Sequence, residues 1–303
     1  MTTATWSSGN SHTSDAEFRA WGSEFSSKLA AVGLIQTTDT GQINWATVTK
    51  PGTTNTNAGY EIWRFNDPAQ STSPLFLKIS YGNGSNVSLL TPRIQIEVGT
   101  ATNGAGTLSG IGSGVQLPGS NNVGSNAGGS ATAQSSYMCY VDGFFGFVWK
   151  RSATNQGYFF LSRTCDATGT PDGSGYLIWA LGSNAGASGA LSNIRMVRLE
   201  SPATVVYSTT SSTGEAGVAI TPGYLSSTTL PNGDKQAYMV WTANPDMRPI
   251  FSLCAVLPAE FAAGTTFSTA MVGSAARTFL NTGVTGNNVA INSAGYQMAM
   301  LWE

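Results

Sequence analysis

The sequence predicts a mainly β fold, namely an antiparallel β-sandwich or jelly-roll-like arrangement with one N-terminal amphipathic helix. About a dozen short segments alternate apolar and polar residues, which is the period of a strand buried on one side. Gly, Asn, Ser and Pro separate these segments, as turns between strands require. Only one segment repeats its apolar residues at helical spacing. Many short strands with frequent turn signals are typical of sandwiches and jelly rolls.

The predicted helix covers residues 14–32. It begins with Ser14 and Glu17, the spacing of a capping box in which each side chain bonds the other residue's backbone N–H. Gly33 is expected to end the helix, because glycine readily adopts the left-handed conformation common there. Between these signals, large apolar residues recur every three or four positions and form one stripe. The stripe consists of Phe18, Trp21, Phe25, Leu29 and Val32.

The remaining elements are predicted strands, and the alternation is cleanest in the segments 75–81 and 93–98. Their apolar faces carry Leu75, Leu77, Ile79 and Tyr81 in the first segment and Ile94, Ile96 and Val98 in the second. Asp142 and Gly143 form a dipeptide that favours a tight hairpin turn between two further strands. The other predicted strands are 61–65, 137–141, 144–151, 158–163, 176–181, 194–200, 204–207, 237–242, 250–257 and 296–302.

Two of these strands, 144–149 and 176–179, are apolar on both faces. A strand that is covered on both sides lies in the middle of a sheet under another layer, or meets another subunit. The first interpretation, a central strand under the helix or a long loop, is the favoured one. The subunit interface remains open as the alternative.

The predicted organisation is an N-terminal arm at 1–50, which holds the helix, followed by a single β-sandwich domain at 51–303. No linker divides two cores in the sequence. The segment 99–136 contains almost no large side chains and is rich in Gly, Ser and Asn. Unstructured loops longer than about 12–15 residues are uncommon and usually functional or disordered. We therefore expect a long Gly-rich loop at 99–136.

The chain is poor in charge, with 14 basic and 16 acidic residues among 303 and a net charge of −2. Typical domains carry about 25% charged residues, whereas this one carries 10%. Such a balance predicts neither nucleic-acid binding nor membrane insertion, because no basic surface and no long apolar run occurs. The first residues lack the basic and apolar regions of a signal peptide. We expect a protein made in the cytoplasm.

No motif for acid–base, metal or phosphate chemistry is present, so we predict no catalytic, cofactor-binding or metal-binding residues. His12 is the single histidine and lies in a polar segment, where we expect it to be solvated. The acidic residues are scattered, and many of them lie beside Gly or Pro in turn-like contexts. A glycosidase would need two of them as a pair.

The three cysteines, Cys139, Cys165 and Cys254, do not form a Cys-x-x-Cys motif, which argues against a zinc site. Cys139 and Cys165 lie on predicted strands that are able to pair, so a disulfide between them is sterically feasible. Buried free thiols are the favoured expectation for a chain without a signal peptide.

Tryptophans could stack on sugars, but most of them lie within apolar strands, where a core position is the better interpretation. Trp6 and Trp45 are less certain, and a segment that docks on a partner would account for both. The six candidates are Trp6, Trp45, Trp149, Trp179, Trp241 and Trp302.

Six blocks of sequence between residues 60 and 181 stand out. They are Tyr60–Asp67 (YEIWRFND), Pro74–Gly84 (PLFLKISYGNG), Ile94–Thr100 (IQIEVGT), Phe144–Val148 (FFGFV), Phe159–Gly173 (FFLSRTCDATGTPDG) and Tyr176–Ala180 (YLIWA). These blocks resemble bacteriophage virion structural proteins of the tail, baseplate, neck/collar or fibre type. The resemblance implies a structural role and symmetric oligomerisation, and it carries over no catalytic or ligand motif.

We therefore expect a non-enzymatic structural protein of a bacteriophage particle, located in the virion. Its expected partners are copies of itself and other virion proteins. The helix is a candidate docking element because its apolar stripe has to be covered. Its candidate assembly contacts are Phe18, Trp21, Phe25 and Leu29. The alternative is a receptor- or glycan-binding fibre-tip or capsid-decoration protein, whose partner is a host surface receptor.

Overall fold

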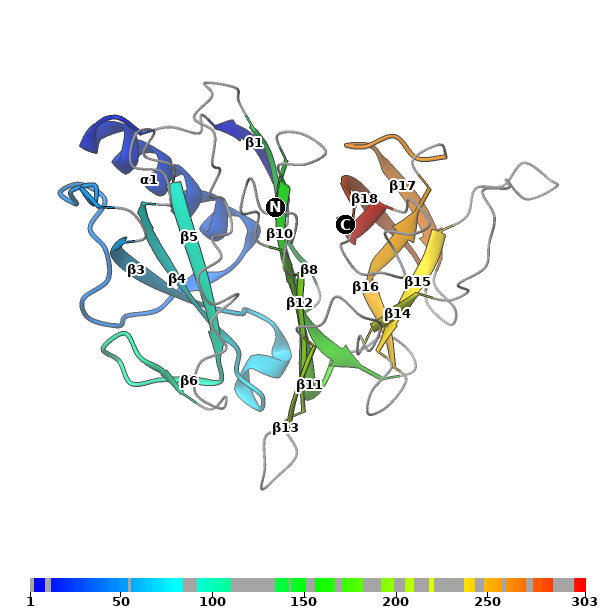
Figure 1. Ribbon diagram of the computed structural model, residues 1–303. Coiled ribbons are helices and arrows are strands. Elements are labelled where there is room, and N and C mark those ends of the chain that lie inside the picture. The colour runs from blue at the N-terminus through cyan, green and yellow to red at the C-terminus, as the bar shows by residue number, and fades with distance from the viewer. Residues whose placement is uncertain are drawn as a thin grey trace. The chain divides into compact units, whose positions relative to one another are not determined.

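The computed structural model in Figure 1 confirms the predicted class: a mainly β chain with antiparallel sheets and one helix near the N-terminus. The residues it describes are 3–8, 12–53, 56–83, 92–109, 134–141, 143–150, 156–166, 171–181, 192–198, 205–209, 218–220, 237–242, 248–257, 260–270, 275–285 and 297–303. The helix is α1, Asp15–Val32, and a short 3-10 helix follows at Pro68–Ser71.

The largest sheet has seven strands in the order β1-β8-β9-β10-β11-β12-β13. Their bounds are Thr3–Ser8, Gln134–Val141, Phe144–Lys150, Gln156–Cys165, Pro171–Leu181, Ser192–Arg198 and Val205–Thr209. The predicted hairpin is present, since β8 and β9 are neighbours and Gly143 has a φ of 74°. Asp142 lies outside the described residues.

The second sheet has six strands in the order β14-β15-β16-β19-β18-β17. Their bounds are Val218–Ile220, Ala237–Thr242, Arg248–Val256, Gln297–Leu301, Ala276–Thr285 and Thr266–Ala270. The third sheet, β2-β3-β4-β5, consists of Ile35–Gln36, Thr56–Arg64, Phe76–Asn83 and Pro92–Gly99. A small hairpin pairs β6, Ala101–Thr102, with β7, Leu108–Ser109.

The chain divides into two compact units, where the sequence had predicted an arm at 1–50 and one domain at 51–303. The first unit contains residues 1–138, 147–159 and 180–191, and the second contains 139–146, 160–179 and 192–303. Residues 1–50 thus belong to a compact unit together with the four-stranded sheet. The sequence shows no linker between the units, because segments from the middle of the chain alternate between them.

The predicted helix boundaries are confirmed by their caps. The backbone N–H of Glu17 donates to the Ser14 hydroxyl at 3.2 Å, and the Ser14 N–H donates to the Glu17 carboxylate at 3.1 Å. At the other end Gly33 adopts a φ of 110°, and its N–H bonds the carbonyl of Ala30 at 3.0 Å. Local side-chain and backbone chemistry therefore fixes both ends.

The first unit places α1 against the four-stranded sheet, as Figure 1 shows. The ring of Phe25 lies 6.0 Å from the ring of Tyr81 on β4 and 5.0 Å from that of Phe147 on β9. The predicted apolar face of the segment 75–81, most of which forms β4, is confirmed, because Leu75, Leu77, Ile79 and Tyr81 are all 0% exposed. The helix stripe and this face of the sheet form the core of the unit.

The second unit has the sheet-on-sheet packing of a sandwich. Cys139 of β8 and Met300 of β19 bring their sulfur atoms to 3.9 Å. The hydroxyls of Ser162 on β10 and Ser252 on β16 lie 2.9 Å apart. Gly146 of β9 provides space for the Met300 side chain, because a Cβ at position 146 would come within 2.9 Å of the Met300 sulfur. Small and sulfur-containing side chains thus make these contacts between the two layers.

The segment 99–136, expected to be a long loop, contains strands at both of its ends. The chain forms the β6–β7 hairpin at 101–109, and β8 begins at Gln134. Residues 110–133 lie outside the described residues. None of the three cysteines forms a disulfide. Cys139 and Cys254 are buried thiols, as expected, whereas Cys165 is partly exposed.

Candidate functional site

The helix residues predicted as assembly contacts lie in the core of the first unit. Phe18, Trp21, Phe25 and Leu29 are 1%, 7%, 2% and 0% exposed. Their rings contact residues of this same unit, such as Tyr81 on β4. The stripe is therefore covered by the chain itself, which corrects the expectation that a partner covers it. An assembly contact through these side chains would require the helix to leave the sheet.

A buried carboxylate beneath the helix ties four segments together. Glu61 of β3 is 1% exposed. One of its oxygens accepts hydrogen bonds from the Ser26 hydroxyl at 2.8 Å and the Trp45 indole at 2.9 Å. The other accepts from the Trp63 indole at 3.2 Å and the Tyr81 hydroxyl at 2.6 Å. We call these five residues the Glu61 network.

The Glu61 network is saturated, because both carboxylate oxygens are occupied by donors. Burial, together with the neighbouring Glu61 carboxylate, raises the pKa of Tyr81 well above its ordinary value. Tyr81 thus remains a neutral donor. The network orients α1, the 44–48 turn, β3 and β4, which is a structural use of a carboxylate. Sequence reasoning missed this network, although Glu61 and Trp63 are two residues apart on a predicted strand and therefore share a face.

His12 is buried, which corrects the expectation of a solvated residue. Its exposure is 5%, and its ring lies 5.2 Å from that of Trp21 and 6.2 Å from that of Phe18. Burial lowers its pKa to about 4, against a smaller opposite effect of Glu17. No described residue hydrogen-bonds its Nε2. The imidazole therefore packs as a neutral ring on the helix.

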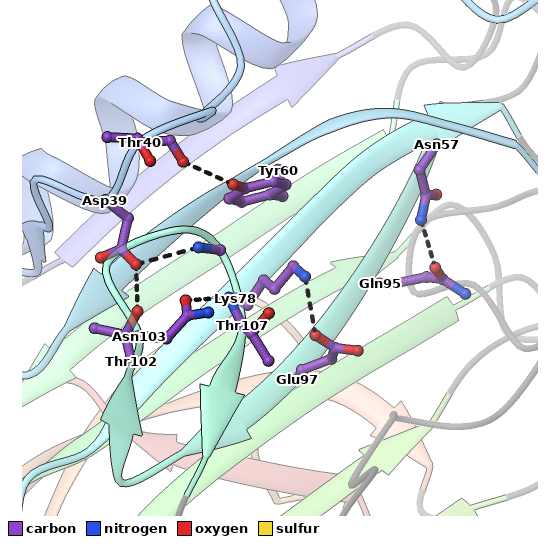
Figure 2. Close-up of polar contacts among 11 residues, drawn as sticks. Asp39, Thr40, Asn57, Tyr60, Lys78, Gln95, Glu97, Thr102, Asn103 and Thr107 are labelled. Carbon is purple, nitrogen blue, oxygen red and sulfur yellow. Dashed lines mark hydrogen bonds and ion pairs between the residues drawn. The ribbon is translucent and has the colours of Figure 1, made fainter.

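The opposite side of the four-stranded sheet carries polar side chains in cross-strand register, as Figure 2 shows. Lys78 on β4 faces Glu97 on β5 at 3.6 Å, and its Nζ lies 4.7 Å from the centre of the Tyr60 ring. Asn57 donates to the Gln95 side chain at 2.8 Å. We call these five residues the polar face.

The β6–β7 hairpin is clamped beside the polar face by Asp39. This carboxylate is 8% exposed and accepts hydrogen bonds from the hydroxyls of Thr37, at 2.6 Å, and Thr102. The Gly106 N–H also donates to it, at 3.4 Å. Burial alone would raise the pKa of Asp39, but these hydrogen bonds outweigh it and lower the pKa. The charged carboxylate therefore holds the hairpin to the 37–43 segment.

Tyr60 links the hairpin to the polar face. Its hydroxyl donates to the Thr40 carbonyl at 2.8 Å (Figure 2). Gly106 has a φ of 91°, and a Cβ there would come within 2.1 Å of the Tyr60 oxygen. The ring is thus approached by Gly106 at its hydroxyl end and by the Lys78 ammonium over one face.

The polar face could hydrogen-bond a hydroxyl-rich ligand through its amide and charged groups. Such a ligand would have to replace the pairings among these side chains. In the part of the chain that the structure describes, no three His, Cys, Asp or Glu side chains come together as they would in a metal site. The polar face is therefore a candidate for weak polar binding.

Trp6 and Trp45, for which docking on a partner was an alternative, contact residues of the first unit. Trp6 on β1 stacks on Phe147 with ring centroids 6.0 Å apart. Trp45 belongs to the Glu61 network. Trp149 and Trp302 are buried, with exposures of 0% and 9%. The side chains of Trp179 and Trp241 lie outside the described residues.

Comparison with known proteins gives no relative: no protein-family model matches the chain, and no curated protein is significantly similar to it. Within the described residues, no helix has the length and apolar character needed to cross a membrane.

Proposed function

We propose that this chain is a non-enzymatic structural protein of a bacteriophage particle, which assembles as a symmetric oligomer in the tail, baseplate or neck/collar. Its partners are copies of itself and other virion proteins. The resemblance of the blocks between residues 60 and 181 supports the class of protein. The character of the sheet edges supports the assembly role.

The observation that carries the proposal is the absence of charge from the end strands of both large sheets. The strands β1, β13, β14 and β17 have the sequences TATWSS, VVYST, VAI and TFSTA. None of them contains Asp, Glu, Lys, Arg or Pro. Monomeric β proteins usually protect such edges with charged residues, prolines or bulges, because an open edge pairs with other chains. Among the residues that the structure describes, end strands without charge or proline favour a chain whose edges are used in assembly.

The low overall charge favours the same role. A surface rich in Ser, Thr, Asn and Gly is cheaper to bury than one rich in charges, because charged groups lose more hydration free energy. The chain has 35 Ser, 36 Thr and 36 Gly against 30 charged residues. This balance favours extensive contacts between subunits.

The test is the protein content of purified particles. Mass spectrometry of gradient-purified virions should find this chain at a constant number of copies per particle, and labelling with an antibody should locate it in negative-stain images. An abundant host cytoplasmic protein serves as the contamination control. Absence of the chain from particles, or recovery at the level of that control, would overturn the proposal.

A second candidate function, glycan or receptor binding, is favoured by the polar face. Glycan binding often uses amide and charged side chains on an exposed sheet. If it operates here, Gln95→Ala should abolish binding on a glycan array, while Ser23→Ala, an exposed change on α1, should not. A correctly folded oligomer that binds no glycan rejects this candidate.

A further inference from the structure

β17 ends the six-stranded sheet of the second unit, and among the described residues it pairs on one side only. Its partner is β18, with Ser268 opposite Thr278 and Phe267 opposite Phe279. Figure 1 shows it in orange at the end of its sheet. No other strand that the structure describes takes its second edge.

The hydrogen bonds of Thr278 show which backbone N–H and C=O groups of β17 point away from β18. The Thr278 N–H donates to the carbonyl of Glu303 at 3.0 Å, and its carbonyl accepts from the Trp302 N–H at 2.8 Å. Thr278 therefore directs its backbone away from β17. In an antiparallel pair of strands, two opposite residues that do not hydrogen-bond each other both point their backbone N–H and C=O groups away from the partner strand. Ser268 is such a residue, and Thr266 and Ala270 follow at the strand period of two.

The outward groups lie on a pre-ordered strand. The ring of Phe267 contacts the tilted ring of Phe261 and stacks on that of Phe279, with centroids 4.2 Å and 5.9 Å away. The side chains of Thr266 and Ser268, on the other face, are exposed. A strand that is already ordered loses little conformational entropy when it pairs, so its edge is ready for a partner strand.

The contrast with β5, the end strand of the four-stranded sheet, is informative. β5 begins with Pro92 and carries Arg93 and Glu97. The chain that follows it is capped by the small hairpin, since the Thr100 N–H donates to the Ser109 carbonyl at 2.9 Å. These are the usual protections of an edge strand. The chain thus protects one end strand and leaves β17 without charge, proline or bulge.

We infer that β17 pairs antiparallel with the β17 of a second copy of this chain, about a two-fold axis at Ser268. A two-fold axis requires an edge that is complementary to itself. In this register Ser268 faces the partner's Ser268, and Thr266 faces the partner's Ala270. All of these residues point their backbone groups outward, so each N–H meets a carbonyl. The two six-stranded sheets become one continuous sheet of twelve strands.

This inference rests on the symmetric oligomer of the proposed function and names its contact. It also explains why position 268 carries no charge: the residue at a two-fold axis faces its own copy, so a charge there would repel the same charge on the partner. A hydroxyl such as that of Ser268 avoids this repulsion.

The experiment uses opposite charges at the axis in the full-length chain. Ser268→Lys and Ser268→Glu should each weaken self-association at least tenfold, measured by analytical ultracentrifugation, because like charges then face each other. An equimolar mixture should recover association as a heterodimer. Ser23→Lys adds a charge on exposed helix surface and should leave association unchanged. Circular dichroism confirms that each variant is folded.

The outcomes separate the two proposals. If both Ser268 variants associate as the unchanged chain does, or if mixing them restores nothing, the pairing at β17 is wrong while a symmetric oligomer can persist through other contacts. If the unchanged chain sediments as a monomer at all accessible concentrations, the pairing and the symmetric oligomer are both wrong. Detection of the chain in purified particles remains an independent test of its structural role.

Discussion

The indole of Trp45 donates a 2.9 Å hydrogen bond to the carboxylate of Glu61, which is 1% exposed. The bond connects the turn after the helix to the middle of β3. A buried carboxylate is stabilised only where hydrogen-bond donors replace its lost hydration. Ser26, Trp63 and Tyr81 donate the other three hydrogen bonds to Glu61. The first unit is thus organised around one buried acid whose two oxygens both accept hydrogen bonds.

The first prediction concerns that acid. Glu61→Gln replaces one acceptor oxygen by an NH2 group that faces donors and leaves at least one of them without a partner. A buried donor without a partner costs about 1–3 kcal/mol. We expect the free energy of unfolding to fall by about that amount, measured by urea denaturation with tryptophan fluorescence. Glu24→Gln, on the partly exposed side of α1, is the control and should change stability by less than about 0.5 kcal/mol. Equal stability of the two variants would show that the network is dispensable.

Gly22 provides the space for Trp45, and this gives the second prediction. A Cβ at Gly22 would lie 1.9 Å from the Trp45 ring. Alanine improves helix propensity by about 1 kcal/mol, whereas forced overpacking costs about 1–3 kcal/mol or more. Because the ring cannot move without losing its bond to Glu61, we expect Gly22→Ala to be destabilising on balance.

Gly52→Ala is the matched control, since nothing lies within 4 Å of the added Cβ. Thermal unfolding of both variants should show a lower midpoint for Gly22→Ala alone. A midpoint for Gly22→Ala above that of the unchanged chain would mean that helix propensity outweighs packing here.

The third prediction separates backbone strain from packing in the β6–β7 hairpin. Gly104 and Gly106 both have positive φ values, 78° and 91°. Alanine in the left-handed region costs about 1–2 kcal/mol at either site. Only at Gly106 does the Cβ also collide with Tyr60, because Gly104 has open space around it. Gly106→Ala should therefore be the more destabilising change, by about 1–3 kcal/mol.

Amide hydrogen exchange reports this difference locally. In Gly106→Ala the protection of the Thr40 N–H, which donates to the Gly104 carbonyl at 2.8 Å, should fall further than in Gly104→Ala. Equal loss in the two variants would exclude a role for the Tyr60 contact.

Local signals explain which elements were predictable. The capping box and Gly33 fix α1 through neighbours in the sequence, and β4 shows its burial as alternation. β17 was missed because TFSTA has a single large apolar residue, and its strand conformation comes from β18. β18 was missed because its register shifts between Asn281 and Val284, which breaks the alternation.

The positions that sequence reasoning placed wrongly depend on distant contacts. His12 is surrounded by polar neighbours in the sequence, but the chain folds it onto Phe18 and Trp21. The apolar stripe of α1 has to be buried against something, and helical spacing alone does not show whether a sheet of the same unit or a partner protein buries it. The burial of Glu61 could have been predicted, because the strand period places it on the same face as Trp63.

The fourth prediction concerns the thiols. Cys139 and Cys254 are 0% exposed, and burial raises the pKa of both thiols far above the ordinary value, which suppresses the reactive thiolate. Cys165 is partly exposed. Under native conditions iodoacetamide should therefore add one group per chain, at Cys165, as read by intact mass and peptide mapping. Rapid labelling of all three thiols before denaturation would contradict the burial of the other two.

The last prediction is a pH dependence that comes from His12. Its pKa is about 4 in the folded chain, against 6.5 for the ordinary group. The unfolded chain therefore binds a proton between pH 6.5 and pH 4 that the folded chain rejects. By linkage the stability contribution is fully present above pH 6.5 and is lost as the pH falls toward 4, by up to about 3 kcal/mol in total.

The charged groups near this ring are Glu17, whose carboxylate raises the His12 pKa, and Lys50, which lowers it; burial exceeds both effects. His12→Gln removes the titrating group and keeps these neighbours. Other carboxylates titrate in both chains, so their contribution cancels in the comparison. Urea denaturation at half-unit steps from pH 4 to 7 should give the unchanged chain the steeper loss of stability, by up to about 1.4 kcal/mol per pH unit. Parallel curves for the two chains would mean that His12 is protonated equally in the folded and unfolded states, and its burial against Trp21 would then be wrong.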